Sequence, residues 1–195
     1  MTRGRPIAFS PDQATSAAMQ VFWARGYDSA STRDLLDAMQ ISRSSLYQAY
    51  GNKEQLFLEA MRRYRDNLLV RLAKRSEAAP SALAFIEGLF LDTAAEAGSE
   101  RAALGCLIFN SAGELGQREG LAAEEARRSL DAITALFQQV IVAAQRQGDI
   151  DAQRDSKALA TYLTMGMAGL RTLLKSTQDR AATQAAATMF LASLR

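Results

Sequence analysis

The segment 31–53, STRDLLDAMQISRSSLYQAYGNK, constrains the fold most, because it contains two helix starts in close succession. Ser31 is a favoured N-cap residue, and Asp34 follows it three positions later, as in a capping box. Ser42 is placed to cap a second short helix. Gln40 and Ile41 are left to form the turn between them. The segment therefore predicts two short helices joined by a tight turn.

The second of these helices has a polar surface of unusual composition. Its apolar contacts would be Leu46 and Ala49, which leaves Arg43, Ser44, Ser45, Tyr47 and Gln48 on other faces. Arginine can bind guanine through two hydrogen bonds, glutamine can bind adenine, and serine can bind a base or a phosphate. This pattern favours a helix that enters the major groove of DNA. The alternative is an ordinary helical hairpin with a polar face.

The flanking residues extend the pattern in an order that resembles the TetR/AcrR family of bacterial transcriptional repressors. The matching phrases, which span residues 1–60, are Arg3-Gly4-Arg5-Pro6, then Phe22 to Gly26-Tyr27, then Leu46-Tyr47 with Tyr50, then Gly51, Lys53-Glu54 and Leu56-Phe57. The resemblance implies a homodimer that binds a palindromic double-stranded DNA operator and is released by a small-molecule effector.

The residues expected to contact DNA lie in the arm, the helix-turn-helix and the start of the following helix. They are Arg3, Arg5, Ser31, Thr32, Arg33, Ser42, Arg43, Ser44, Ser45, Tyr47, Gln48, Tyr50 and Lys53. The family usually has glycine in place of Gln40 and Ser44, and phenylalanine in place of Tyr50. If Gln40 adopts a left-handed conformation, the strain is about 1 kcal/mol. For the arm, the alternative is a solvated terminus without a role in binding.

The rest of the chain favours an all-α fold, because it has only three prolines and almost no alternating β-branched pattern. About nine helices are expected. Three form a DNA-binding head over residues 1–52, and six lie mainly in a ligand-binding and dimerisation body over residues 53–195. A connecting helix over 53–75 joins the two parts, followed by helices at about 81–97, 101–115, 120–147, 156–175 and 179–194.

Charge is distributed unevenly along the chain. Residues 1–75 contain 12 Lys/Arg and 7 Asp/Glu, a net charge of +5, whereas residues 76–195 contain 11 and 14, a net charge of −3. A basic amino-terminal third is typical of a DNA-binding head on a separate sensing body. A non-specific nucleoid protein is the alternative, but it would need only distributed Lys and Arg, without the base-reading side chains of residues 42–48.

Composition argues against an enzyme and against a membrane protein. With no histidine and one cysteine, the chain lacks Ser-His and Cys-His pairs and cannot build a histidine or thiolate zinc site. No phosphate-binding glycine loop is present, so we expect no cofactor. No apolar run approaches the roughly 18–20 residues of a transmembrane helix, and Arg171 interrupts the best candidate, 162–174. These features and the absence of a signal-like apolar run predict a cytoplasmic protein.

An effector site is expected where apolar and isolated polar residues mix in the middle helices. The candidates are Ile86, Phe90, Cys106, Asn110, Glu114, Phe137 and Ile141. The alternative is a plain core with Asn110 satisfied locally. For Cys106 we favour burial over a sensing role, since Arg101 would lie on a different face of a continuous helix and a sensor thiol needs nearby positive charge.

The last two helices, 156–175 and 179–194, carry small and apolar residues on more than one face. Gly166 and Gly169 would be costly inside a helix unless another backbone approaches closely. We therefore expect a two-fold, four-helix dimer interface. Its predicted residues are Tyr162, Gly166, Gly169, Leu170, Leu173, Ala186 and Phe190. The alternative is that both helices are simply central in the body.

Overall fold

The computed structural model describes residues 10–194, so Arg3 and Arg5 of the predicted arm lie outside the described residues. The expected all-α fold is confirmed, and every regular element within 10–194 is helical. The helices are α1 (Pro11–Ser29), α2 (Thr32–Met39), α3 (Arg43–Tyr50), α4 (Lys53–Ala78), α5 (Ala82–Ala94), α6 (Glu100–Leu104), α7 (Leu107–Leu115), α8 (Leu121–Gln147), α9 (Ser156–Leu173) and α10 (Arg180–Ala192).

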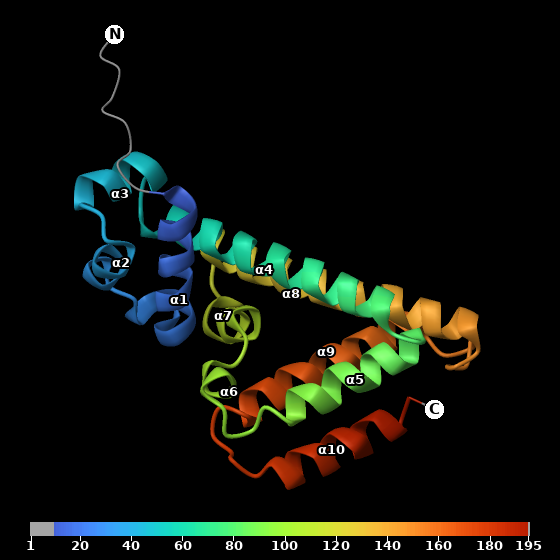
Figure 1. Cartoon of the computed structure of the whole chain (residues 1–195). Helices are drawn as coiled ribbons and strands as arrows, with labels where there is room; N and C mark the ends of the chain where they lie inside the picture. The colour runs from blue at the N-terminus through green and yellow to red at the C-terminus, as the bar shows by residue number, and fades with distance from the viewer. Residues whose placement is uncertain (1–9, 195) are drawn as a thin grey trace.

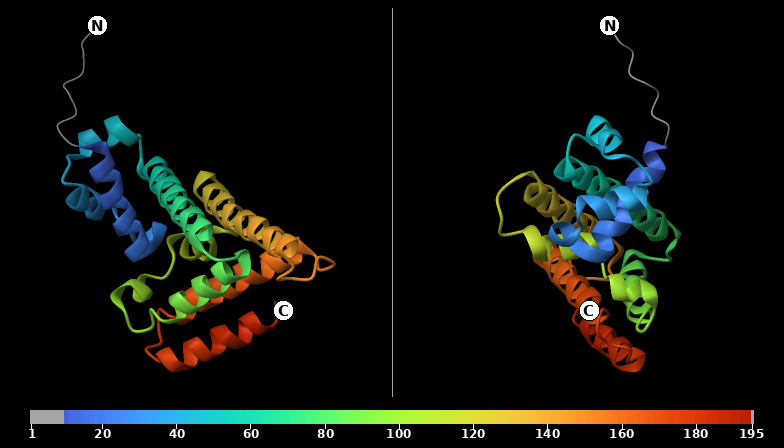
Figure 2. Two further views of the ribbon diagram at one scale, coloured as in Figure 1. Left: turned by 45° about the vertical axis from the view of Figure 1, so that its right-hand side comes forward. Right: turned by 90° about the vertical axis from the view of Figure 1, so that its left-hand side faces the viewer.

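The helices form a small head and an elongated body (Figure 1). Helices α1, α2 and α3 make the head, and the long α4 leaves it and runs beside α8. Helices α5 and α9 form a second layer below α4 and α8, with α10 outermost, as Figure 1 and the turned views in Figure 2 show. Helix α7 packs against α1, α4 and α8, so it lies between the head and the body.

The two helix starts expected at Ser31 and Ser42 are both present in the head. Ser31 and Asp34 form a capping box, and the Ser45 backbone N–H donates to Ser42 Oγ at 3.1 Å. The Gln55 backbone N–H donates to Asn52 Oδ1 at 2.8 Å, which caps α4. Gln40 is left-handed, with φ 55° and ψ 41°, as its place in the turn requires. These local interactions fix the direction of each short helix.

The single helix expected over 101–115 is broken into α6 and α7 at Gly105, which has φ 66° and ψ −139°. A Cβ at this position would lie 3.0 Å from Lys175 Cδ and 3.1 Å from Asn110 Oδ1. The Asn110 side-chain amide donates to the Leu104 carbonyl at 2.9 Å and so satisfies the end of α6. The break therefore depends on a glycine and on a side-chain cap that comes from the next helix.

The head and the body share one apolar core through α4. Phe22 of α1 packs edge-to-face on Phe57 of α4, with ring centroids 5.1 Å apart, and both side chains are fully buried. Leu35 of α2 and Leu46 of α3 are also buried in this core. Because α4 also packs along α8, the orientation of the head is fixed against the body.

The glycine at position 166 makes room for a ring of the same chain. Phe190 stacks on Tyr162 at 4.2 Å and on Phe90 at 5.1 Å. A Cβ on Gly166 would lie 2.1 Å from Phe190 Cζ, whereas a Cβ on Gly169 would meet nothing within 4 Å. The sequence analysis attributed Gly166 to the close approach of a second backbone. In the structure, the group that requires a glycine at position 166 is instead the Phe190 ring of the same chain.

We predict opposite effects from two alanine substitutions in α9. Gly166→Ala should lower the free energy of unfolding by about 1–3 kcal/mol, because Phe190 cannot move without losing its stacking partners. Gly169→Ala should raise the free energy of unfolding of a monomeric chain by about 0.5–1 kcal/mol, since alanine is the better helix former and its Cβ would meet no neighbouring side chain within 4 Å in the same chain. Urea unfolding of both variants at one protein concentration measures this. Equal effects would contradict the packing described for Phe190.

Candidate DNA-binding surface and ligand cavity

Helix α3 presents a polar surface to solvent. Arg43, Ser44, Tyr47 and Gln48 are exposed, and the Tyr47 ring is 50% exposed although it is large and aromatic. Within residues 10–194, no hydrogen bond or ion pair engages the side chains of Arg43, Tyr47 or Gln48. These groups are therefore available to a binding partner. Figure 1 shows α3 at the end of the head that lies away from α10.

The buried side of α3 differs in one detail from the expected pattern. Leu46 is buried as predicted, but Ala49 is exposed and Tyr50 packs against the core instead. The Tyr50 hydroxyl lies 3.0 Å from Thr15 Oγ1 and donates to the Pro11 carbonyl at 3.2 Å. It thereby ties the end of α3 to the start of α1. Tyr50 thus has partners within the head, and its contact with DNA stays a prediction.

Other predicted DNA contacts already have intrachain partners. Ser31 is engaged in its capping box, and Thr32 is half-buried. Arg33 forms an exposed pair with Asp37 at 3.8 Å. Lys53 Nζ donates to the Asp28 carbonyl at 3.3 Å and lies 4.8 Å from the centroid of the Tyr27 ring. These side chains border the α3 surface, and their role toward DNA stays a prediction.

A carboxylate of the body binds the end of α1. Glu114, near the end of α7, accepts the Tyr27 backbone N–H at 2.9 Å and the Asp28 backbone N–H at 2.8 Å. Gly26, with φ 81°, allows this approach, since a Cβ there would lie 2.7 Å from Glu114 Oε2. We call these two hydrogen bonds the head–body clasp. Glu114 was expected at the effector site, but the structure places it here.

An ion pair stands beside the clasp. Arg118 binds Asp28 through two hydrogen bonds of 3.0 and 2.7 Å. The hydrogen bonds from Arg118 hold the pKa of Asp28 below its ordinary value. Both side chains are about half exposed, so the pair adds little stability of its own. It sets the position of the loop after α7 relative to the head.

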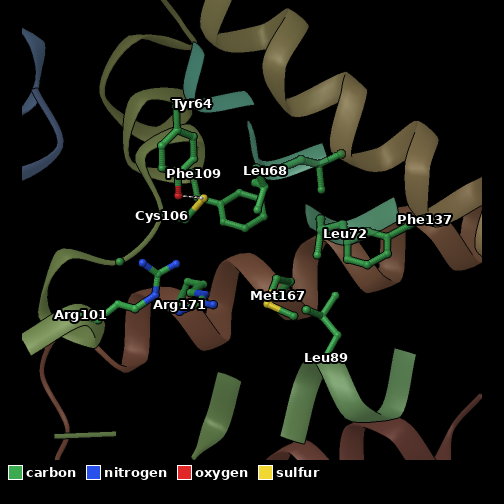
Figure 3. A pocket seen from close by; sticks show the side chains of 12 residues that line it. Tyr64, Leu68, Leu72, Leu89, Arg101, Cys106, Phe109, Phe137, Met167 and Arg171 are labelled. Atoms are coloured by element: carbon green, nitrogen blue, oxygen red, sulfur yellow. Dashed lines mark hydrogen bonds between the residues drawn. The ribbon is translucent and has the colours of Figure 1, made fainter. Parts of the chain in front are cut away.

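A cavity of about 50 Å³ lies between α4, α5, α6, α7, α8 and α9 (Figure 3). Of the predicted effector residues, Cys106 and Phe137 line it. Ile86, Phe90 and Ile141 are buried elsewhere in the core, Asn110 caps α6, and Glu114 forms the clasp. The full lining is Tyr64, Leu68, Leu72, Leu89, Arg101, Gly105, Cys106, Phe109, Ile133, Phe137, Met167 and Arg171.

The polar groups of the cavity gather at one end. In Figure 3, Arg101 and Arg171 lie close together at this end, Leu72 and Phe137 lie at the other end, and Met167 lies between them. Arg101 lines the same cavity as Cys106 because the break at Gly105 removes the continuous helix that the sequence suggested. Arg171 was visible in the sequence only as an interruption of an apolar run. Neither arginine was predicted as a ligand-binding residue.

Cys106 is buried, as the packing interpretation expected. The Tyr64 hydroxyl donates toward its sulfur at 3.6 Å. Burial raises the pKa of Tyr64, and the neighbouring Cys106 raises it further, so the hydroxyl stays protonated and acts as a donor. Tyr64 and Cys106 thus form a polar pair on the cavity wall.

The outer face of α9 and α10 is apolar. Six of the seven predicted dimer residues line one shallow groove of about 250 Å³: Gly166, Gly169, Leu170, Leu173, Ala186 and Phe190. Tyr162 lies behind it and donates to the Phe190 carbonyl at 3.2 Å. Met165 and Met189, which were not predicted, are 67% and 77% exposed on these helices. Large exposed apolar side chains of this kind mark an interaction surface.

No helix within 10–194 is long and apolar enough to cross a membrane. No cluster of His, Cys, Asp or Glu side chains in the same range could hold a metal ion.

Two family models match the chain. The model described as bacterial regulatory proteins, tetR family, covers residues 14–60, and the model of the tetracyclin repressor-like C-terminal domain covers residues 83–190. The chain belongs to the TetR family. It is therefore a DNA-binding transcriptional regulator and not an enzyme, and the helix-turn-helix interpretation of residues 31–53 is confirmed.

Relatives agree over most of the chain. The HTH-type transcriptional regulator YezE of Bacillus subtilis is 30% identical over 177 residues, which are 90% of this chain and 91% of YezE. The HTH-type transcriptional repressor ComR of Escherichia coli is 30% identical over 173 residues, or 87% and 81% of the two chains. A cysteine mutant of the TetR family regulator CifR, in complex with 26-bp double-strand operator DNA, superposes with a TM-score of 0.84 at 31% identity and covers 98% of this chain and 100% of CifR.

We predict that Glu114→Ala weakens the attachment of the head. The substitution leaves two backbone N–H groups without their charged acceptor, and it should lower the free energy of unfolding by about 1–3 kcal/mol. Amide hydrogen exchange at Tyr27 and Asp28 should become faster. Glu119→Ala is the control, since that side chain is exposed on the neighbouring loop. Unchanged exchange at both amides would contradict the clasp.

Proposed function

We propose that this TetR-family regulator is a repressor that binds a palindromic operator as a homodimer and dissociates from it when a small molecule occupies the cavity. The observation that carries the proposal is the α3 surface, where Arg43, Tyr47 and Gln48 are exposed and their side chains have no partner among residues 10–194. ComR is named a repressor, and CifR is described in complex with operator DNA, which supports the proposal by similarity. Such a regulator would act in the cytoplasm, where the bacterial chromosome lies.

The chemistry of α3 favours sequence-specific binding. Arg43 and Gln48 carry the donor and acceptor groups that read guanine and adenine edges in the major groove. Ser42 and Ser44 at the start of the helix, together with the helix dipole, suit a phosphate. The basic arm with Arg3 and Arg5 would add phosphate or minor-groove contacts. A nucleoid protein of low specificity would have no need of the amide and guanidinium groups on this one helix.

The α9–α10 face supplies the surface for the homodimer. Its groove, with the exposed Met165, Leu173 and Met189 around it, offers an apolar area that a second copy would cover by two-fold symmetry. Two heads in one dimer would bind half-sites about 34–36 Å apart on one face of B-DNA. Operator binding would then depend on the spacing of the heads.

Helix α7 connects the cavity to the head, so it could couple ligand binding to the spacing of the two heads. Cys106 and Phe109, at its start, line the cavity, and Glu114, near its end, binds α1. A ligand that shifts α7 would thus move the head through the clasp. If the ligand prefers the shifted state, operator affinity falls by the same coupling free energy, typically about 1–3 kcal/mol. A ligand that prefers the DNA-bound arrangement would instead act as a co-repressor.

We predict that α3 sets the base preference. Arg43→Ala and Gln48→Ala should each cost about 1–3 kcal/mol at the preferred operator and much less at mismatched sites, because a base contact is lost. Genomic-fragment selection followed by footprinting of the wild type defines the operator, and titration of the variants then measures the loss. Gln117→Ala, an exposed residue of the body, is the control. Retained selectivity in the double variant would exclude this assignment of α3.

We also predict a homodimer through α9 and α10. Met165→Glu and Met189→Glu should produce monomers that stay helical, because a carboxylate buried without a partner in an apolar interface is costly. Both side chains are exposed within one chain, so the substitutions spare the fold. Val70→Glu is the matched control, since Val70 is 54% exposed on α4. A wild-type mass near one chain by light scattering at micromolar concentration would remove the dimer and the palindromic mechanism.

A further inference from the structure

The polar end of the cavity carries an excess of positive charge. Arg171 donates to Glu96 Oε2 at 2.6 Å and to Thr93 Oγ1 at 3.3 Å. Arg101 reaches the same Glu96 oxygen only at 3.9 Å. Lys175 lies against Gly105 of the cavity wall, and its Nζ donates to Asn110 Oδ1 at 3.3 Å. We call Arg101, Arg171, Lys175 and Glu96 the cationic rim, which holds three cations and one carboxylate.

The opposite end of the cavity is apolar and the volume is small. Leu72, Leu89 and Phe137 form this end, Met167 lies between the two ends, and Phe109 covers the side (Figure 3). At about 50 Å³, the cavity is far below the roughly 300–1,000 Å³ of sites for drug-sized ligands. Its occupant must therefore be a molecule of few heavy atoms, with an apolar part and a part that suits positive charge.

We propose that the effector is a compact organic monoanion, a carboxylate with a short apolar chain, whose carboxylate binds Arg171 at the cationic rim. The inference rests on the proposed role of this cavity as the effector site. A guanidinium group has five N–H donors in a planar fork, and it binds carboxylates through two parallel hydrogen bonds. Arg171 is only 15% exposed, so such a bond is little screened by water. The chain of the ligand would extend toward Phe137 and Met167.

Other ligand classes fit the rim less well. A cationic ligand would meet the excess positive charge of Arg101 and Lys175. A neutral apolar ligand would fill the far end but leave the guanidinium groups with Glu96 as their only carboxylate partner. A carboxylate ligand would instead compete with Glu96 for Arg171. It would also be attracted by Arg101, whose own distance to the Glu96 carboxylate is 3.9 Å.

Trp23, the single tryptophan, reports on this site. Its ring lies 5.0 Å from the Tyr64 ring and 5.6 Å from the Arg101 guanidinium, and both residues line the cavity. Its fluorescence can thus follow titrations with acetate, butanoate and hexanoate in the absence of DNA. Butanamide and butylammonium are the matched neutral and cationic probes. Butanoate should bind about tenfold or more tightly than butanamide, as a charge-assisted hydrogen bond implies.

Two variants of the rim separate recognition from folding. Arg171→Gln should weaken butanoate binding about tenfold and leave butanamide unchanged, whereas Glu96→Gln should strengthen butanoate binding, because it removes the competing carboxylate. A folding defect would instead weaken both probes in both variants, and circular dichroism checks the fold. Arg146→Gln, an exposed arginine distant from the rim, is the control.

The outcomes decide the inference without reference to DNA. It is overturned if butanamide binds as tightly as butanoate, if Glu96→Gln weakens butanoate binding as Arg171→Gln does, or if none of the three carboxylates binds saturably. Operator footprinting of the wild type is run in parallel. Retained operator binding without carboxylate binding overturns the ligand class only, whereas absence of operator binding overturns the proposed function and leaves the carboxylate result standing.

Discussion

The two hydrogen bonds from the Tyr27 and Asp28 backbones to Glu114 are the constraint on which the rest of the arrangement depends. They satisfy N–H groups at the kinked end of α1 with a charged acceptor from the body, which is stronger than a neutral bond. The head also meets the body through the apolar contacts of α4 and through the packing of α1 on α7. The clasp adds two directional hydrogen bonds to these apolar contacts.

The position of the clasp matters because α7 is short. Its nine residues span about 13 Å at 1.5 Å per residue, with cavity-lining side chains at one end and Glu114 near the other. In the proposed mechanism, a ligand that displaces Cys106 and Phe109 would act on α1 through this one short helix. The same helix is anchored by Gly105 before it and by Arg118, after it, which binds Asp28.

Local sequence signals predicted the head well and the body only in outline. Ser31 and Ser42 cap their helices as expected, because an N-cap needs only a side chain and an amide a few residues away. The sequence grouped Glu114 and Asn110 in one effector site, whereas their partners are a backbone in α1 and a carbonyl in α6. Periodicity identifies a face of a helix but not what that face meets.

The lining of the cavity could not be predicted from helical periodicity either, because it depends on the break at Gly105. In a continuous helix Arg101 and Cys106 would point in different directions, and no sequence pattern would place both around one space. A left-handed break at Gly105 turns α6 away from α7, so that both residues face the cavity, where Arg171 of α9 joins them. A charged side chain inside an apolar helix is costly unless it is paired, and Glu96 with Thr93 supplies that pairing. The arginine that disrupts the apolar pattern of α9 is therefore the residue that gives the cavity its chemical character.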